Sequence, residues 1–435
     1  MTWIQRYRLK RFLESSVWVV PLLSVVAAMM LHRFLWWVEL RTRWAWLDFS
    51  PEGARSVVSA VTSSMLTFTV FAFSILLLAV QIAGAQLSPR VITLAMEDRL
   101  LKLALGTFAA TFTYSLAVLG RITDVAPQLS MVVVAIGCFA SLGVFVYLVD
   151  QTAKNLRPAG VIGKVAGMAN QVIEAVYPHP LKEADSLSAE QVISASDKPS
   201  RTIYYQGGSG MLQALDGPGL AETARRHGCI IRMAPQVGDF ITNGEPLFHI
   251  YGDGAGLSDR ELHQAMVVGV ERTLRQDPAF AFRIIVDIAS KALSPAINDP
   301  STAVLALDQI HRLLRIVGRR YLGDGTIRDA AGAVRVILPT PNWEDFVSLG
   351  MSEIRFFGAS SIQVVRRLRA MIENLLSVLP EMRHPALREQ LELLDHTVER
   401  SYPDPADRAN AGIGDCQGVG ASRRNQPTAD PARGK

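Results

Sequence analysis

Four long apolar runs follow one another in the first third of the chain. They extend over Val17–Val38, Val57–Ile82, Leu100–Leu119 and roughly Leu129–Val149. As a helix, the second run would be about 39 Å long at about 1.5 Å per residue, which exceeds the thickness of the hydrocarbon core of a bilayer. The pattern therefore predicts four transmembrane helices, whose surroundings are a lipid bilayer.

The second run contains no charged residue, but polar residues recur along it at intervals of three, four or seven. Such intervals place them on one side of a helix. The other side carries apolar residues such as Val61, Met65 and Ala72. The polar stripe, as we call it, consists of Ser56, Ser59, Ser63, Thr67, Ser74, Gln81 and Ser88.

The polar stripe has two interpretations. Small hydroxylated residues let neighbouring helices pack closely and hydrogen-bond. Alternatively, they line a water-filled path for a small solute or ion, in one chain or around the axis of a homo-oligomer. Gln81 favours a path slightly, because a serine can bond the preceding turn of its own helix whereas a primary amide needs other partners. The predicted path-lining residues are Ser59, Ser63, Thr67, Ser74 and Gln81.

Lysine and arginine are distributed unevenly between the segments that flank the apolar runs. The N-terminus, the segment after the second run and the segment after the fourth run are rich in them, whereas the other side carries Arg41, Arg43, Arg55 and Arg121. Positive residues accumulate on the cytoplasmic side of a membrane. We therefore expect both termini, and everything after Asp150, to be cytoplasmic.

Charge and cysteine content exclude several classes. A net charge of +4 is too small to indicate binding of nucleic acid, so we expect no such partner. The cysteines, Cys138, Cys229 and Cys416, lie far apart without CxxC spacing, which is typical neither of a disulfide framework nor of a zinc site. No Asp, Glu or Lys lies at mid-span, which argues against a proton-relay pump.

After the fourth run, short segments broken by glycine and proline predict strands, and longer periodic segments predict helices. The fold class is therefore an α-helical integral membrane protein with four transmembrane helices, followed by a cytoplasmic α+β domain. The tail is rich in Pro, Gly, Ala and Arg, which predicts disorder. The predicted divisions are a four-span transmembrane domain (1–155), an amphipathic helix and linker (156–200), a small β-rich subdomain (201–256), a mainly helical subdomain (257–400) and a disordered tail (401–435).

Within the β-rich segment, VGDFITNGEPLFHI (Val237–Ile250) resembles the turn of biotinyl and lipoyl carrier domains. The modified lysine of those carriers lies in a hairpin just beyond, where this chain reads YGDGAG. The resemblance implies a similar β-turn but no attachment of a cofactor, and we expect none.

The stretch Arg283–Leu314 concentrates polar residues where two predicted helices meet at the turn SPAIND. Asp277–Pro278 and Asp299–Pro300 look like helix starts, with Asp as N-cap and Pro at the first helical position. The polar residues either stabilise these helices or line a cytoplasmic pocket. Asp308 with His311 is too small a group to predict a metal site. The candidate pocket residues are Asp287, Ser294, Asn298, Asp299 and Asp308.

The four apolar runs, the stretch SSMLTFTVFAFSILLLAVQIAGAQLSPRVI and the stretch DIASKALSPAINDPSTAV together resemble the bacterial predicted membrane proteins of domain of unknown function 2254. The likeness extends to about Arg400. It implies the architecture described above and a multi-pass protein of the bacterial inner (plasma) membrane, and it implies no catalytic or binding residue.

Three classes of function follow. The first is an oligomeric channel or transporter with a cytoplasmic regulatory domain. The second is a membrane-anchored sensor or interaction protein whose cytoplasmic domain binds a partner or small ligand. We find no catalytic grouping such as Ser/His/Asp and expect the protein not to be an enzyme; a membrane-bound enzyme would have to use Asp287, Asn298, Asp299 and Asp308.

Overall fold

The computed structural model describes residues 3–42, 50–82, 84, 87–90, 99–123, 126–155, 157–181, 198–254, 256–323 and 325–420. The chain divides into two compact units. One comprises Tyr7–Gly160, and the other comprises Met1–Arg6 with Val161–Lys435. Most of the predicted linker, residues 182–197, and the end of the predicted tail, residues 421–435, lie outside the described residues.

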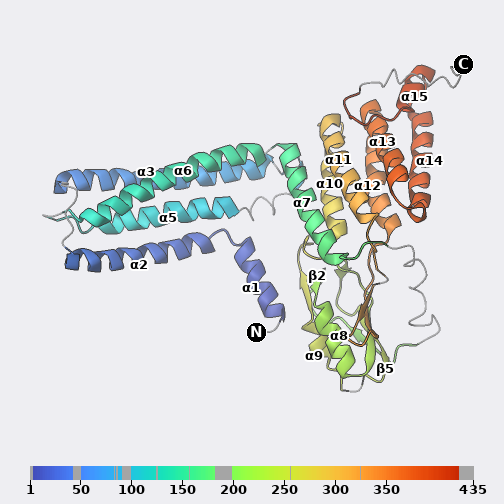
Figure 1. Ribbon diagram of the computed structural model, residues 1–435, viewed down its shortest axis with the longest axis horizontal. Coiled ribbons are helices and arrows are strands. Elements are labelled where there is room, and N and C mark those ends of the chain that lie inside the picture. The colour runs from blue at the N-terminus through green and yellow to red at the C-terminus, as the bar shows by residue number, and fades with distance from the viewer. Residues whose placement is uncertain are drawn as a thin grey trace, which may run out of the picture. The chain divides into compact units, whose positions relative to one another are not determined.

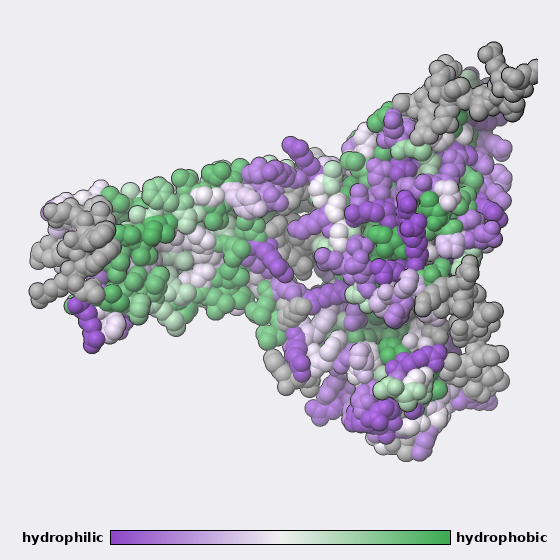
Figure 2. Space-filling model, viewed as in Figure 1, coloured by the Kyte–Doolittle hydropathy of each residue, from purple (hydrophilic) through white to green (hydrophobic). Residues whose placement is uncertain are grey.

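The first unit is a bundle of long helices (Figure 1). In the described ranges, four helices are long and apolar enough to cross a membrane. Hydrophobic residues dominate the surface of this unit, and hydrophilic ones dominate that of the other (Figure 2). The four predicted apolar spans are thereby confirmed as helices. Their bounds are Val19–Thr42 for α2, Pro51–Ile82 for α3, Arg99–Leu119 for α5 and Gln128–Asn155 for α6; α1 (Trp3–Ser15) precedes them.

Helix α5 is the centre of this bundle, because it contacts α2, α3 and α6 more extensively than those helices contact one another. In the apolar stretch of α5 that could cross a membrane, 56% of the residues are buried, compared with 11–17% in the other three spans. Two glycines allow close approach of the neighbouring helices. A Cβ on Gly106 would lie 2.8 Å from Oγ of Ser24 in α2, and one on Gly137 of α6 would lie 3.1 Å from Thr111 of α5.

The second unit contains a β-rich subdomain with two sheets. The larger has the order β1-β5-β3-β8-β7 and the smaller the order β4-β2-β6. All pairs are antiparallel except β3–β8, which is parallel. The bounds are Arg201–Tyr204 (β1), Gly210–Leu215 (β2), Cys229–Met233 (β3), Phe240–Ile241 (β4), Pro246–Gly252 (β5), Met266–Gly269 (β6), Thr326–Arg328 (β7) and Val334–Ile337 (β8), with helices α8 (Gly217–Arg226) and α9 (Asp259–His263) between strands.

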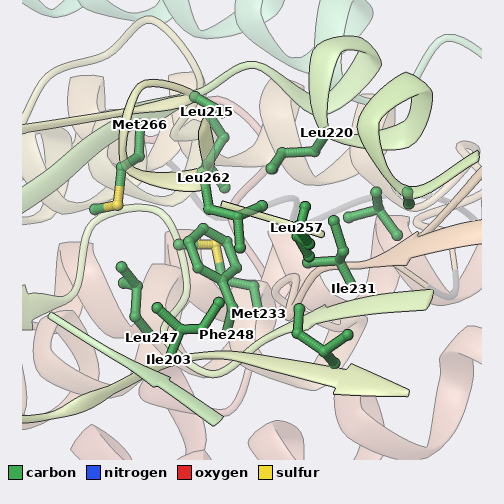
Figure 3. Packing of buried hydrophobic residues seen from close by; sticks show 14 of the residues in the cluster. Ile203, Leu215, Leu220, Ile231, Met233, Leu247, Phe248, Leu257, Leu262 and Met266 are labelled. Atoms are coloured by element: carbon green, nitrogen blue, oxygen red, sulfur yellow. The ribbon is translucent and has the colours of Figure 1, made fainter. Parts of the chain in front are cut away.

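One apolar core joins the two sheets and both small helices. Phe248 of β5 packs near Met233 of β3 and Leu262 of α9, as Figure 3 shows. The core includes Val336 of β8, which follows the helices of residues 278–292 and 300–317 in sequence. The β-rich subdomain therefore extends beyond the predicted boundary at residue 256 and takes in a hairpin from residues 326–337. The carrier-like turn has Gly238 and Gly244 at φ +98° and +88°, conformations that favour glycine.

The remaining elements form a helical subdomain. Both predicted Asp-Pro helix starts are confirmed: Asp277 accepts a hydrogen bond from the N–H of Phe280 at 3.0 Å, and Asp299 accepts one from the N–H of Thr302 at 3.1 Å. Tyr177 directly follows α7 (Pro158–Val176), and its ring packs edge-on against Phe346. This contact connects the end of α7 to the core of the helical subdomain. The helices are α7 (Pro158–Val176), α10 (Pro278–Ala292), α11 (Pro300–Val317), α12 (Trp343–Phe357), α13 (Ile362–Val378), the 3₁₀ turn η3 (Glu381–Arg383) and α14 (His384–Ser401).

Residues 401–420, for which composition predicts disorder, instead form α15 (Pro405–Ala411) and a segment bound to α13. The guanidinium of Arg366, 1% exposed, donates to the carbonyl of Ile413 at 3.0 Å and to that of Gly420 at 3.1 Å. In return, the N–H of Asp415 donates to the carbonyl of Arg366 at 3.0 Å. These bonds give a segment with few large apolar residues a fixed conformation.

The two Asp-Pro caps predict different costs of substitution. Asp277 is 3% exposed and also pairs with Arg272 at 2.5 Å, whereas Asp299 is only partly buried. Asp299→Ala should lower the free energy of unfolding by about 1 kcal/mol, as typical loss of a cap does. Asp277→Ala should lower it by about 3 kcal/mol, because it also leaves the partly buried Arg272 without its partner.

Both losses of free energy can be measured by unfolding the full-length chain in denaturant. Susceptibility of the second unit to a protease reports its unfolding. Equal losses for the two variants would show that the Arg272 pair adds nothing to the cap.

Candidate functional site

The five predicted path-lining residues all lie on the outward side of α3 and are exposed in the single chain. The opposite side of the helix is packed within the bundle. Val58, Met65 and Ala72 are completely buried there. The polar stripe therefore does not line the interior of its own bundle, and a path along it needs further copies of the chain.

Several hydroxyls of α3 bond to their own helix. Thr67 donates to the carbonyl of Ser63 at 3.2 Å, and Ser74 donates to that of Val70 at 3.0 Å. Such bonds satisfy the hydroxyl without another partner, so these positions tolerate lipid, protein or water. The amide of Gln81 has four hydrogen-bonding positions and is exposed, which makes it the most demanding residue of the stripe.

The bundle interior holds polar residues that the sequence analysis does not single out. Thr62 of α3 donates to Ser115 of α5 at 3.0 Å. Thr111 of α5 and Ser141 of α6 lie 3.1 Å apart. The spacing of four between Thr111 and Ser115 is the signal that one face of the third span is polar. This spacing indicates bonds between helices only when α5 is known to be the central helix.

The candidate pocket residues of the second unit fall into three separately bonded groups. Asp287 accepts from Nε of Arg283 at 2.7 Å, and the same guanidinium binds both carboxylate oxygens of Glu353 in α12. Asp308 instead bonds to α13. The hydrogen bonds of these residues therefore stabilise helix packing, and they do not draw the predicted pocket residues together.

The SPAIND turn forms the third group. Its N–H groups bond inward, from Asn298 to the carbonyl of Ser294 and from Asp299 to that of Ala292, each at 2.8 Å. The hydroxyl of Ser294 donates to the carbonyl of Lys291 at 2.7 Å. Asn298 has φ +48°, the one positive value at a non-glycine residue in the part of the chain that the structure describes. Asparagine adopts this conformation at low cost, which accounts for its place in the turn.

Asp308 belongs to a network around a buried arginine. Arg367, 6% exposed, donates to Asp308 at 2.7 Å and to Nδ1 of His311 at 3.1 Å. Because arginine only donates, Nδ1 must accept, and Nε2–H of His311 then donates to Asn374 at 2.8 Å. The imidazole is therefore neutral. Burial lowers the pKa of His311, and the nearby Arg367 and Arg315 lower it further, while Asn374 and Asp308 act in the opposite direction.

Two shallow depressions lie in the β-rich subdomain. The larger, about 430 Å³, is lined by Asp239, Phe240, Glu245 and His249 together with neighbouring prolines. The smaller, about 310 Å³, has Arg232 as its charged lining residue. Among the residues that the structure describes, no group of three His, Cys, Asp or Glu side chains is placed to hold a metal ion.

Four apolar helices followed by a mixed α/β unit define a predicted membrane protein. The chain belongs to the family of predicted membrane proteins DUF2254, whose sequence model matches residues 14–374. Uncharacterized proteins of Mycobacterium bovis and of two strains of Mycobacterium tuberculosis are similar to it. Each is 26% identical over 415 residues, which cover 92% of this chain and 79% of the relative. No solved structure matches the chain.

The His311 network predicts that acid destabilises the second unit. In the unfolded chain a histidine protonates near pH 6.5, but in the folded chain the lowered pKa postpones protonation to lower pH. The unfolded state then binds more protons, so the stability present above about pH 6.5 falls as the pH decreases below it.

His311→Gln should reduce this pH dependence between about pH 7 and 5, because its amide can accept from Arg367 and donate to Asn374 without titrating. Unfolding of the full-length chain at several pH values measures the slope. His396→Gln, at an exposed position, is the matched control. An unchanged slope in His311→Gln would contradict the prediction.

Proposed function

We propose that the protein is a homo-oligomeric channel or transporter of the bacterial inner membrane, in which the polar stripe of α3 faces other copies of the chain. The observation that carries the proposal is the outward position of the five predicted path-lining residues, on the side of α3 that the bundle leaves uncovered. Ser88, the last residue of the stripe, lies beyond α3 and is buried. The family assignment as a predicted membrane protein supports the location.

The physical argument concerns Gln81. A buried amide without partners costs a few kcal/mol in an apolar environment. Hydrocarbon offers it none, whereas a neighbouring copy or water at an oligomer axis offers several. Ser59, Ser63, Thr67 and Ser74 share its side of the helix, so the same neighbour would cover all five predicted path-lining residues. The transported species would be a small solute or ion.

The cytoplasmic unit would regulate such a path. Helix α7 begins at Pro158, close after the end of α6 at Asn155. A short connection transmits a displacement of a domain to the adjoining span more directly than a long linker does. In this proposal both termini are cytoplasmic, as the distribution of Lys and Arg indicates.

A sensor or interaction protein is the second candidate. The observation that favours it is the depression lined by Asp239, Glu245 and His249, whose volume of about 430 Å³ is within the range of small-molecule sites. Its carboxylates would suit a cationic ligand.

Cysteine chemistry along α3 tests the proposal. In a chain with Cys138→Ala, Cys229→Ala and Cys416→Ser, single cysteines replace the stripe residues or control residues. In intact membranes each variant is treated with an oxidant, which cross-links neighbouring copies, and separately with a small membrane-impermeant thiol reagent. The stripe positions are Ser63, Thr67, Ser74 and Gln81; the buried controls are Met65 and Ala72, and the exposed controls on either side of the stripe are Phe71 and Phe73.

For an oligomeric path, the stripe positions cross-link and also react with the reagent, at least about tenfold faster than the controls. Cross-linking without reaction indicates a packing face in a dry oligomer, which favours the sensor. Equal behaviour of the stripe and of Phe71 and Phe73 means that the stripe faces lipid, and the proposal is then wrong.

Transport itself is tested by flux. In liposomes that contain the wild-type chain, Gln81→Leu should reduce a measured ion or solute flux severalfold, because it removes the largest polar group of the path. Phe73→Leu is the matched control on the same helix. If both variants conduct like the wild type, Gln81 does not line the path.

A further inference from the structure

A buried histidine lies inside the four-helix bundle, away from the polar stripe. His32 of α2 is 6% exposed, and neither Nδ1 nor Nε2 has a hydrogen-bond partner in the structure. Its ring meets the ring of Tyr114 of α5 edge-on, with the ring centres 5.7 Å apart. Tyr114 is 4% exposed; its hydroxyl makes no direct hydrogen bond of ordinary geometry, although Ser130 lies near enough to interact with it.

More unfilled hydrogen-bonding positions occur towards the same end of the bundle. Nη1 of Arg121, after α5, and Oε1 of Gln128, at the start of α6, are buried without partners in the structure. With His32 and Tyr114 they make five polar atoms. Each such atom costs about 1–3 kcal/mol if it stays unsatisfied, which together rivals the total stability of a domain. A small ligand that both donates and accepts hydrogen bonds would satisfy these atoms.

A carboxylate lies on the same face of α2 as the histidine. Glu39 follows His32 by seven residues, and it accepts from the N–H of Ser130 at 2.8 Å and from its hydroxyl at 3.0 Å. Ser130 belongs to the first turn of α6, where the helix dipole favours a negative charge. Glu39 is within electrostatic range of His32, so it can compensate a positive imidazolium.

The other charged groups around His32 are cations. Arg33 follows it on α2, and Arg121 lies within electrostatic range. On α3, Arg55 donates to the carbonyl of Ile122 at 2.7 Å. α6 contributes the neutral Ser130 and Gln128. Arg121 is also stacked over the ring of Trp36, with its central carbon 4.2 Å from the ring centre. The guanidinium of Arg121 opposes a positive charge on His32, and Glu39 is the one described carboxylate positioned to balance that charge.

We propose that His32 and Tyr114 form a hydrated proton-binding site in the core of each bundle, with Glu39 as its counter-ion. Water satisfies the imidazole and the phenol, because it donates and accepts equally well. The imidazole nitrogen takes a proton from a hydronium ion, which is left as a water molecule. Ionisable residues within membrane segments are commonly functional. This site is independent of the polar stripe, because it lies within one bundle.

Nuclear magnetic resonance of the full-length chain in lipid bilayers tests the site. The chain, labelled with ¹⁵N at its eight histidines, is compared with His32→Phe to identify the signals of His32. His32→Gln serves the same purpose if the phenylalanine variant does not assemble. The expected result is magnetisation transfer from water to the His32 imidazole, and conversion of that imidazole from neutral to charged between pH 8 and pH 4.

Two further variants test the partners. In Glu39→Gln, half-protonation of His32 should require an at least about tenfold higher proton concentration, because the variant lacks the negative counter-charge. Tyr114→Phe keeps the edge-on ring contact but should weaken the water transfer. The remaining histidines serve as internal references. A His32 signal that stays neutral down to pH 4, or that receives no magnetisation from water, would overturn the proposal and show a dry core.

Discussion

A bilayer contains no hydrogen-bonding solvent, and for four helices long and apolar enough to cross one, this is the constraint on which the rest of the first unit depends. Polar side chains inside the bundle have to find partners on other helices, and α5 provides most of them through Thr111 and Ser115. The close approach at Gly106 and Gly137 brings the neighbouring helices within reach of these groups. Inside the bundle, hydroxyls such as Thr62 and Thr111 are bonded between helices, whereas Thr67 and Ser74 of the stripe bond to the carbonyls of their own helix.

In the second unit, the main feature is a group of buried arginines on α13. Arg366, Arg367 and Arg369 are consecutive or nearly so on α13, and all are at most 8% exposed. Each binds a different element: the C-terminal segment, α11 and, through Asp395, α14. One helix therefore binds two other helices and the C-terminal segment by charge-assisted bonds. Burial alone would raise the pKa of Asp415 in the bound segment, but backbone N–H groups of Gly420, Gln417 and Gly418 outweigh it and hold the pKa below its usual value.

Local patterns predicted much of this architecture. Unbroken apolar length was sufficient for the four spans, and Asp-Pro was sufficient for two helix starts, because both depend on neighbouring residues only. Long-range partners could not be predicted: Arg367 and Asp308 are 59 positions apart. His32 was overlooked because its burial depends on which face of α2 meets α5. The tail was misjudged because its order comes from backbone bonds to Arg366, which composition does not reveal.

The parallel pairing of β3 with β8 has a consequence for biosynthesis. Strand β3 leaves the ribosome well before β8, and α10 and α11 lie between them in sequence. Until β8 arrives, one edge of the growing sheet is open, and open edges invite pairing with other chains. Two intervening helices that fold early would shorten the distance that β8 has to search. Helices α10 and α11 would thus help β8 to reach the strands that precede them in the chain.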